Sequence, residues 1–306
     1  MKFGFKHLKR HEIDVVKWNE AIKNAVNTRI YAYSWYLDVM TDRQWSALIY
    51  KDYDCVFPLL VKTRFYLKYV THPYLCQQLG IFSKTSDQQD IYSTHVLNYL
   101  RVNYFKTDCS VNSNFMKNEY LKAKTNHILD LNKPYNEIKK SYNRNTKRNI
   151  GKALAEMVVI EETSDINSFL HFMKKNDNTK IVDSIEKNIH MLMETTFKLG
   201  RGLLIFAKDH SGLNAVAFFI IDENRIYFLL CSSDKSGKEK KAMYFIIDSV
   251  IKRFAGNNKI LDFTGSNITN IARRNLGFGA MDEPYFSLRL RWNPFLKFDK
   301  KSITGQ

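Results

Sequence analysis

The 306-residue sequence has few cysteines, five prolines and no long apolar run. Its four cysteines, Cys55, Cys76, Cys109 and Cys231, lie far apart without a C-x-x-C pair, which argues against a disulfide framework or a zinc site and favours reduced thiols. The longest apolar stretch, 215–221, is too short to span a bilayer, and the N-terminal MKFGFKHLKRHE lacks the apolar segment of a signal peptide. We therefore expect a soluble, cytoplasmic protein with no stable membrane insertion.

Signatures of several enzyme classes are also missing. The sequence contains no G-x-S-x-G, P-loop, G-x-G-x-x-G or H-E-x-x-H motif. Its eight histidines show no ligand spacing, so we expect no bound metal. These absences argue against the common serine hydrolases, P-loop nucleotidases, dinucleotide-binding dehydrogenases and zinc proteases.

Acidic residues are the other shortage. There are 31 Asp and Glu against 47 Lys and Arg, which gives a formal net charge of +16. Such a surplus favours polyanionic partners such as nucleic acid, nucleotide phosphates or anionic headgroups, and an ordinary basic soluble protein is the alternative. With 44% hydrophobic residues, the chain is able to bury a large core and is long enough for two domains.

One pattern of strands and helices appears twice along the chain. Three strands joined by short turns are predicted in each half, at 47–50, 55–61 and 65–70 and again at 203–207, 215–221 and 226–231. A helix and a short strand follow each set, at 89–104 with 107–111 and at 242–254 with 260–265. The repetition predicts an α/β fold (α+β, mixed sheets) with an N-terminal domain at 1–130 and a C-terminal domain at 131–306.

The segment 135–157 has the period of an amphipathic helix. Its apolar face is predicted to comprise Ile138, Tyr142, Ile150, Ala153, Leu154 and Met157. A basic row lies on the opposite face, spaced four residues apart: Lys140, Arg144, Arg148 and Lys152. We expect this row to pair with phosphates of a donor or acceptor, with a solvated surface as the alternative.

A second basic segment joins the last predicted strand of the second meander to its helix. This segment, SSDKSGKEKKA, leads into a helix N-terminus, where free backbone N–H groups favour anions. The candidate donor-binding residues are Ser232, Ser233, Lys235, Gly237, Lys238, Lys240, Lys241 and Ala242, together with Arg144 and Arg148. A solvated lysine-rich loop is the alternative.

Asp262 is the candidate catalytic residue, because a carboxylate near the end of a central strand is able to accept a proton from an attacking ammonium. The alternative role is to order the turn or cap the next helix. An acceptor cleft is predicted from Tyr36, Gln77, Gln78, Asn267 and Arg273. Aromatic residues such as Tyr36 are also common in cores, and the two glutamines need hydrogen-bond partners if they are buried.

Several segments together resemble the FemAB-like branch of the GCN5-related N-acetyltransferase (GNAT) superfamily. They are YSWYLDVM, HPYLCQQLGIFS, NRNTKRNIGKA and LDFTGSNITNIARRNLGFGA, with QQLG, KRNIGKA and DFTGS the strongest. The resemblance spans roughly residues 30–290 and implies two tandem GNAT-like domains with a cleft between them. In that family a tyrosine acid precedes a glycine by four residues, and here Asn275 precedes Gly279.

The resemblance implies an N-acyltransferase without a covalent enzyme intermediate, with an oxyanion held by backbone N–H groups near 230–233. The implied co-substrate is acyl-CoA, or aminoacyl-tRNA as in FemAB-type proteins, and the acceptor is an amine on a small molecule, peptide or cell-wall precursor. The family's pyrophosphate-binding pattern is absent and Asn275 is no acid. A non-catalytic RNA- or polyanion-binding module that keeps the duplicated fold is therefore the alternative.

Overall fold

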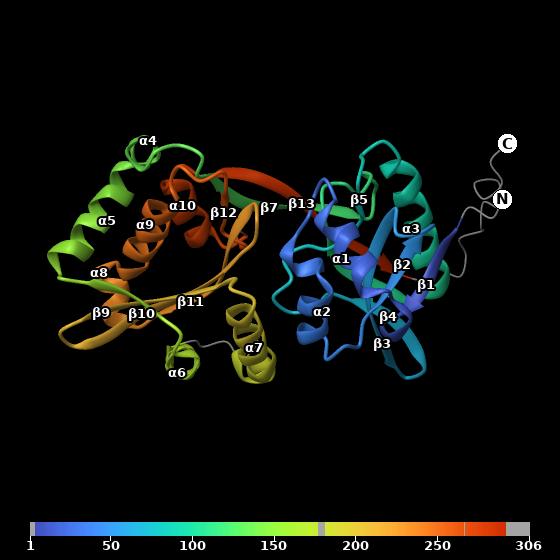
Figure 1. Cartoon of the computed structure of the whole chain (residues 1–306), viewed down its shortest axis with the longest axis horizontal. Helices are drawn as coiled ribbons and strands as arrows, with labels where there is room; N and C mark the ends of the chain where they lie inside the picture. The colour runs from blue at the N-terminus through green and yellow to red at the C-terminus, as the bar shows by residue number, and fades with distance from the viewer. Residues whose placement is uncertain (1–3, 177–180, 266, 292–306) are drawn as a thin grey trace. The chain divides into compact units, whose positions relative to one another are not determined.

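The computed structural model of the chain describes residues 4–176, 181–265 and 267–291 (Figure 1). These residues form two compact units. Of the described residues, the first contains 4–34, Gln44–Lys122 and 286–291. The second contains Trp35–Arg43 and Ala123–Tyr285. The units therefore divide the chain differently from the predicted boundary at residue 130, because each takes in a piece from the other's half of the sequence.

The first unit is a sheet in the order β1-β2-β3-β4-β6-β13, with β5 paired to β3. All its neighbours are antiparallel except β4 and β6, which run parallel. Its elements are β1 (Phe5–Lys9), η1 (Arg10–Glu12), α1 (Val15–Lys23), η2 (Ile30–Ala32), β2 (Ser46–Tyr50), β3 (Cys55–Arg64), β4 (Leu67–Thr71), β5 (Phe82–Ser83), α3 (Gln89–Asn103) and β6 (Lys106–Val111), joined by the end of β13 (Met281–Arg291).

The second unit has a sheet in the order β7-β12-β11-β10-β9-β8, in which β11 and β12 are the parallel pair. Its elements are α2 (Ser34–Met40), β7 (Leu121–Asp130), α4 (Tyr135–Lys140), α5 (Arg144–Ala155), β8 (Val159–Thr163), α6 (Ile166–Asn176), α7 (Ile181–Lys198), β9 (Gly202–Asp209), β10 (Gly212–Ile221), β11 (Arg225–Ser233), α8 (Lys235–Lys240), α9 (Ala242–Phe254), β12 (Ile260–Asp262) and α10 (Thr269–Gly277).

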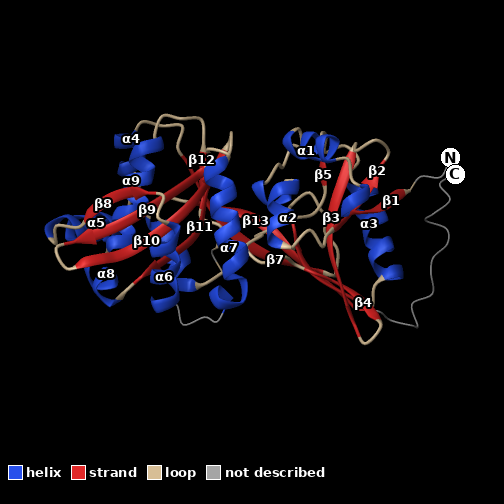
Figure 2. Cartoon of the chain, turned by 60° about the horizontal axis from the view of Figure 1, so that its bottom comes forward, coloured by secondary structure: helices blue, strands red, loops and turns tan. Residues whose placement is uncertain are grey.

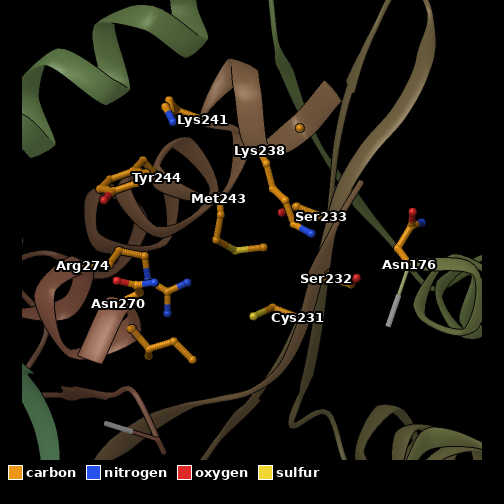
Figure 3. Close-up of a pocket in the computed structure, with 12 residues that line it drawn as sticks. Asn176, Cys231, Ser232, Ser233, Lys238, Lys241, Met243, Tyr244, Asn270 and Arg274 are labelled. Atoms are coloured by element: carbon orange, nitrogen blue, oxygen red, sulfur yellow. The ribbon is translucent and has the colours of Figure 1, made fainter. Parts of the chain in front are cut away.

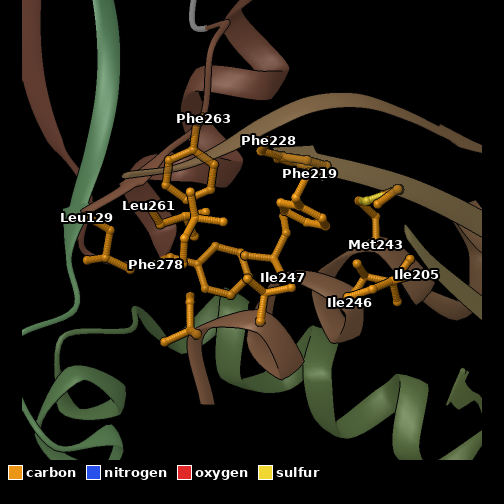
Figure 4. Close-up of a cluster of buried hydrophobic side chains, with 14 of the residues drawn as sticks. Leu129, Ile205, Phe219, Phe228, Met243, Ile246, Ile247, Leu261, Phe263 and Phe278 are labelled. Carbon is orange, nitrogen blue, oxygen red and sulfur yellow. The ribbon is translucent and has the colours of Figure 1, made fainter. Parts of the chain in front are cut away.

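Helices cover both faces of the second unit's sheet (Figure 2). Phe218 of β10 packs against Phe169 of α6 and Phe197 of α7 on one face. On the other face, Phe219 stacks on Phe228 at a ring-centroid distance of 4.8 Å, beside α9 and Phe278 (Figure 4). Burial on both faces explains why residues 215–220 form an uninterrupted apolar run rather than an alternating one.

The predicted repeat is confirmed by the structure. The three-strand meanders are β2-β3-β4 and β9-β10-β11, and α3 with β6 and α9 with β12 follow them. In both units the last strand of this set lies parallel to the third strand of the meander. The sequence segments of the repeat therefore occupy equivalent places in two related sheets.

The predicted helix over 135–157 is interrupted, which corrects the sequence interpretation. The chain breaks between α4 and α5, where the Asn143 side chain caps α5 by accepting from the Thr146 N–H at 2.8 Å. Leu154 and Met157, predicted to be on the buried face, are 56% and 70% exposed. The buried face of α5 instead includes the polar residues Thr146 and Asn149.

The chain between α4 and α5 lies close to the backbone at the end of α10, which explains why the helix is interrupted there. The Asn143 N–H donates to the Gly277 carbonyl at 2.9 Å. A Cβ added at Gly277 would lie 2.5 Å from Thr146 Oγ1, and one at Gly279, whose φ is +84°, would lie 2.3 Å from Ser141 Oγ. The polar residues of SYNRNT and the glycines of NLGFG therefore form one contact between the start of α5 and the end of α10.

Candidate functional site

Strand β11 loses its neighbour on one side partway along its length. β12 pairs with it only from Arg225↔Ile260 to Tyr227↔Asp262, whereas β10 accompanies it to Ser233. Among the described residues, β12 therefore does not extend along the 228–233 edge of β11. Such an edge presents backbone N–H and C=O groups to whatever lies beside it.

Two irregularities mark the point where the strands part. Leu229 has no partner on β10, because Phe218 lies opposite Leu230 and Phe219 opposite Phe228, which is a β-bulge. Thr264, just after β12, has a φ of +52°, a conformation that β-branched residues rarely adopt. Its Oγ1 donates to the Phe228 carbonyl at 2.6 Å. Bulges and strained backbone of this kind are enriched at functional sites.

A cavity of about 650 Å³ lies beside the open edge. Four parts of the second unit line it, namely the end of β11, the α8–α9 junction, one face of α10 and Asn176 at the end of α6 (Figure 3). The principal lining residues are Cys231, Ser232 and Ser233 from β11, Lys238, Lys241, Met243 and Tyr244 from the junction, and Asn270, Ile271 and Arg274 from α10.

The Arg274 guanidinium is held in place by two contacts. Its Nε and Nη2 both donate to Asn275 Oδ1 at 3.2 Å, and its Cζ lies 5.4 Å from the centroid of the Phe228 ring. Asn275 itself is fully buried. The Asn275 amide, at the position where the resemblance implies a tyrosine acid, therefore orients a cation that lines the cavity.

The α8–α9 junction adds further positive potential. Helix α9 follows Lys241, whose left-handed φ of 64° turns the chain between the two helices. The first N–H groups of a helix have no intrahelical acceptors and favour an anion. Lys238 and Lys241 line the cavity beside this helix start (Figure 3). The arrangement suits a phosphate-bearing ligand.

Gly237 allows this junction to pack closely on the sheet. A Cβ added there would lie 2.1 Å from the Asn214 carbonyl oxygen, which is shorter than real Cβ contacts allow. The Asp234 side chain caps the short helix α8 by accepting from the Gly237 N–H at 2.6 Å. The single glycine of SSDKSGKEKKA is thus needed for packing of α8 against β10.

The structure separates the predicted donor-binding residues into three places. Those that line the cavity are Ser232, Ser233, Gly237, Lys238 and Lys241, with Ala242 buried at the first turn of α9. Lys235 is exposed, and Lys240 forms an ion pair with the buried Asp209 carboxylate of β9. Arg144 and Arg148 lie on the exposed face of α5.

Arg274, Met243 and Tyr244 also line the cavity, and the sequence interpretation does not single them out. Arg273, which is predicted for the acceptor cleft, is exposed and does not line this cavity. The spacing of Asn270 and Arg274, four residues apart on one helix face, is the signal that would have distinguished Arg274 from Arg273.

Asp262 is buried within a hydrogen-bonded network. Its Oδ1 accepts from Asn126 Nδ2 at 2.8 Å and from the Thr264 N–H at 2.9 Å, and its Oδ2 accepts from Arg225 Nη1 at 3.0 Å. These are the contacts of a structural carboxylate that orders the turn after β12, which was the alternative role. A role as catalytic base stays a prediction.

The predicted acceptor residues belong to both units. Tyr36 is fully buried and lies edge-on to Trp35, as in a core. Gln78 is also fully buried, and its Nε2 donates to Gln77 Oε1 at 2.9 Å. Asn267 Nδ2 donates to the Tyr285 hydroxyl at 3.1 Å. The acceptor cleft itself stays a prediction.

The predicted basic row does not belong to a single helix. Lys140 ends α4, whereas Arg144, Arg148 and Lys152 follow one another along α5. All four are exposed, and Arg148 Nη2 donates to Asn145 Oδ1 at 2.8 Å. The row on α5 therefore comprises three residues that face solvent.

Membrane-spanning helices and metal clusters are both absent from residues 4–176, 181–265 and 267–291. None of the helices there has the length and apolar character needed to cross a bilayer. The same residues contain no cluster of three or more His, Cys, Asp or Glu side chains arranged to hold a metal ion.

Neither a protein-family model nor a curated protein matches the sequence. Solved structures do match the fold. FemX has a TM-score of 0.63 and 12% identity, with 92% of this chain and 97% of FemX covered. L-PGS from Bacillus licheniformis has a TM-score of 0.52 and 8% identity, with 92% of each chain covered. A tandem GNAT protein from the clavulanic acid biosynthesis pathway has a TM-score of 0.52 and 9% identity, with 94% of this chain and 97% of that protein covered.

These similarities extend over nearly the whole chain. The expected fold, mixed α/β with two tandem GNAT-like domains, is thereby confirmed. At such low identities the comparison concerns the fold alone.

Proposed function

We propose that this chain is an N-acyltransferase that moves an acyl or aminoacyl group from a phosphate-containing donor to an amine. The observation that carries the proposal is the electropositive cavity beside the open edge of β11, lined by Lys238, Lys241 and Arg274. Its helix start and cations suit the donor phosphates, and the strand edge suits the reacting carbonyl.

The proposed reaction is a direct transfer. The neutral amine nitrogen of the acceptor attacks the acyl carbonyl carbon, and a C–N bond forms as the C–S bond of a thioester, or the C–O bond of an aminoacyl ester, breaks. The amine loses one proton, and the leaving thiolate or alkoxide gains one. Backbone N–H groups within 230–233 would hold the oxyanion, and much of the rate would come from proximity of the two substrates.

Several residues have supporting roles in this proposal. Asn275 positions Arg274 for a donor phosphate, and Asp262 positions Thr264 where the strands part. The neutral Ser232 and Ser233 side chains offer hydroxyl donors beside the cations. The acceptor is an amine of a small molecule, a peptide or a cell-wall precursor.

Acyl-CoA is the donor that we propose first. The tandem GNAT protein with the same fold is designated as a form without AcCoA, which supports a coenzyme A thioester as donor. Aminoacyl-tRNA is the other donor, and the exposed row on α5 gives it a basic surface outside the cavity. The same row also favours the second candidate function, a non-catalytic module that binds RNA or another polyanion.

The test is binding and turnover of the donor in matched arginine variants. We expect coenzyme A to raise the melting temperature of the wild-type protein and Arg274→Ala to weaken coenzyme A binding about tenfold or more, since a hydrogen bond to a charged group contributes about 1.5–3 kcal/mol. Arg273→Ala is the control, because it removes the neighbouring exposed arginine and should leave the affinity unchanged. Isothermal titration calorimetry measures the affinity for coenzyme A, and transfer of the acetyl group from acetyl-CoA to amines measures turnover.

Comparison of coenzyme A, acetyl-CoA and tRNA as ligands distinguishes the two possible donors and the two candidate functions. If aminoacyl-tRNA, but not coenzyme A, stabilises the protein and transfers its aminoacyl group, the donor is tRNA. Salt-sensitive RNA binding without transfer, lost in Arg144→Ala/Arg148→Ala/Lys152→Ala, would favour the binding module. No stabilisation by coenzyme A, acetyl-CoA or tRNA would reject the acyltransferase.

A further inference from the structure

The hairpin between β3 and β4 ends in an exposed aromatic turn. Phe65 is 80% exposed, Tyr66 is fully exposed and Leu67 is 47% exposed. Figures 1 and 2 both show β3 and β4 running out together from the first unit to this tip. Large apolar side chains at a protruding tip contribute nothing to the core, so their presence needs another reason.

The backbone of the turn makes the choice of residues more unusual. Phe65 and Tyr66 have φ values of 49° and 64°, so two consecutive residues adopt the left-handed conformation. A two-residue hairpin turn of this kind favours Asn-Gly, because bulky side chains are sterically disfavoured at positive φ. Folding alone therefore favours other residues at both positions.

The tip is surrounded by cations. Lys62, Arg64 and Lys68 are exposed on the two strands, and the Arg64 guanidinium lies 5.2 Å from the centroid of the Phe65 ring. The sequence contains no Asp or Glu from 55 to 86. The hairpin tip is thus apolar at its end and uniformly positive around it.

The same surface continues onto the neighbouring strands. Phe105 is 48% exposed, and its N–H donates to the Lys68 carbonyl at 2.9 Å. Lys106, next in sequence, is exposed and lies opposite Arg291 of β13, which is also exposed. Phe105 therefore extends the apolar surface beside Lys68, and Lys106 and Arg291 add cations, of which Lys106 lies 3.8 Å from the Asp108 carboxylate.

An anionic bilayer surface matches this arrangement. Aromatic rings favour the headgroup region, and Lys and Arg beside them are attracted to anionic lipids. A narrow convex tip is able to enter a bilayer interface, whereas a stable protein interface needs about 800 Å² on each partner. We propose that the tip Phe65–Tyr66, with the cations Lys62, Arg64 and Lys68, docks the protein reversibly on an anionic membrane surface.

The experiment is vesicle co-sedimentation of the full chain. The vesicles are equimolar phosphatidylglycerol and phosphatidylcholine, with pure phosphatidylcholine for comparison, each at about 0.1 M and about 0.5 M salt. We expect the wild-type protein to bind the anionic vesicles at low salt, and to bind them less at high salt. Phe65→Asn/Tyr66→Gly should bind at least about tenfold more weakly, because it removes both apolar side chains from the interface.

The melting temperature of Phe65→Asn/Tyr66→Gly distinguishes a loss of membrane binding from a loss of folding. This variant relieves the steric conflict in the turn, so its melting temperature should equal or exceed that of the wild type. Met157→Gly is the matched control, since Met157 is also exposed and left-handed, with a φ of 55°, and its replacement should leave binding unchanged. Lys62→Ser/Lys68→Ser should weaken binding about 25-fold, from about fivefold for each cation.

Three results would overturn the proposal. The first is no sedimentation of the wild type with anionic vesicles at low salt. The second is equal sedimentation of wild type and Phe65→Asn/Tyr66→Gly. The third is self-association of the wild type in analytical ultracentrifugation that the same variant abolishes without any vesicle binding, which would assign the tip to a second copy of the chain.

Discussion

Arg225 of the second unit shows how a single buried charge is accommodated. It forms ion pairs with Asp262 at 3.0 Å and Glu283 at 2.6 Å, and its side chain is 12% exposed. Burial opposes the charge on Arg225, but the two carboxylates outweigh this and hold its pKa above the usual value. Removal of either carboxylate would leave the cation poorly compensated, so the network specifies the structure near the parted strands.

His127 provides a prediction at the same scale. Its side chain is 3% exposed, and its Nε2 lies 3.1 Å from Asp282 Oδ1. Burial lowers the pKa of His127 despite the opposing effect of Asp282. The folded state therefore binds fewer protons than the unfolded state just below pH 6.5, and stability falls as the pH falls through this region. We expect the melting temperature of His127→Gln to fall less than that of the wild type when the pH is lowered from neutral to mildly acidic values.

Thermal unfolding followed by circular dichroism across this pH range measures the difference. His210→Gln, at an exposed position, controls for the loss of a histidine as such. Parallel pH profiles for the wild type and His127→Gln would contradict the assignment to His127.

At the scale of elements, the contact between α5 and α10 depends on glycine. Gly277→Ala should destabilise the protein by about 1–3 kcal/mol, because the added Cβ would lie 2.5 Å from Thr146 Oγ1. Gly151→Ala, on the exposed face of α5, meets nothing within 4 Å and should stabilise it by about 0.5–1 kcal/mol through helix propensity. Urea denaturation of the two variants checks both signs, and a stabilising Gly277→Ala would show that α5 is able to shift away.

Local sequence patterns predicted the positions of most helices and strands, and the wrong predictions have local causes. The period of 242–254 predicted α9 with its bounds, because its apolar face is continuous. The helix predicted over 135–157 failed at Asn143, where side-chain capping competes with helix continuation. Leu154 and Met157 matched the apolar period but lie beyond the surface that α5 buries.

At the scale of the whole molecule, each half of the sequence contributes one strand to the sheet built mainly by the other half. β13 comes from the end of the described chain but pairs with β6 in the first unit, where Phe286, Leu288 and Leu290 join its core. β7 follows the first repeat but pairs with β12 in the second unit. Each unit is therefore completed by a strand from the other half of the sequence.

The exchange predicts that a fragment of residues 1–130 fails to fold cooperatively. Without β13 it exposes one edge of β6 and loses three buried apolar side chains of the first core. We expect no sigmoidal thermal transition for this fragment by circular dichroism. The control is the same fragment joined through a flexible Gly/Ser linker to a copy of Met281–Arg291, which should regain a transition. Cooperative unfolding of the unlinked fragment at the melting temperature of the full chain would contradict the prediction.

Local patterns were enough to predict the repeat, the mixed α/β fold, the positive charge and the basic segment before α9, because periodicity, turn residues and composition are properties of short segments. Only the three-dimensional structure shows that Arg274 rather than Arg273 lines the cavity and that Asp262 pairs with Arg225. It also shows that β7 pairs with β12 in the second unit and that β13 pairs with β6 in the first. These features depend on which segments distant in sequence become neighbours. Strand pairing and helix orientation determine that, and no local pattern encodes it.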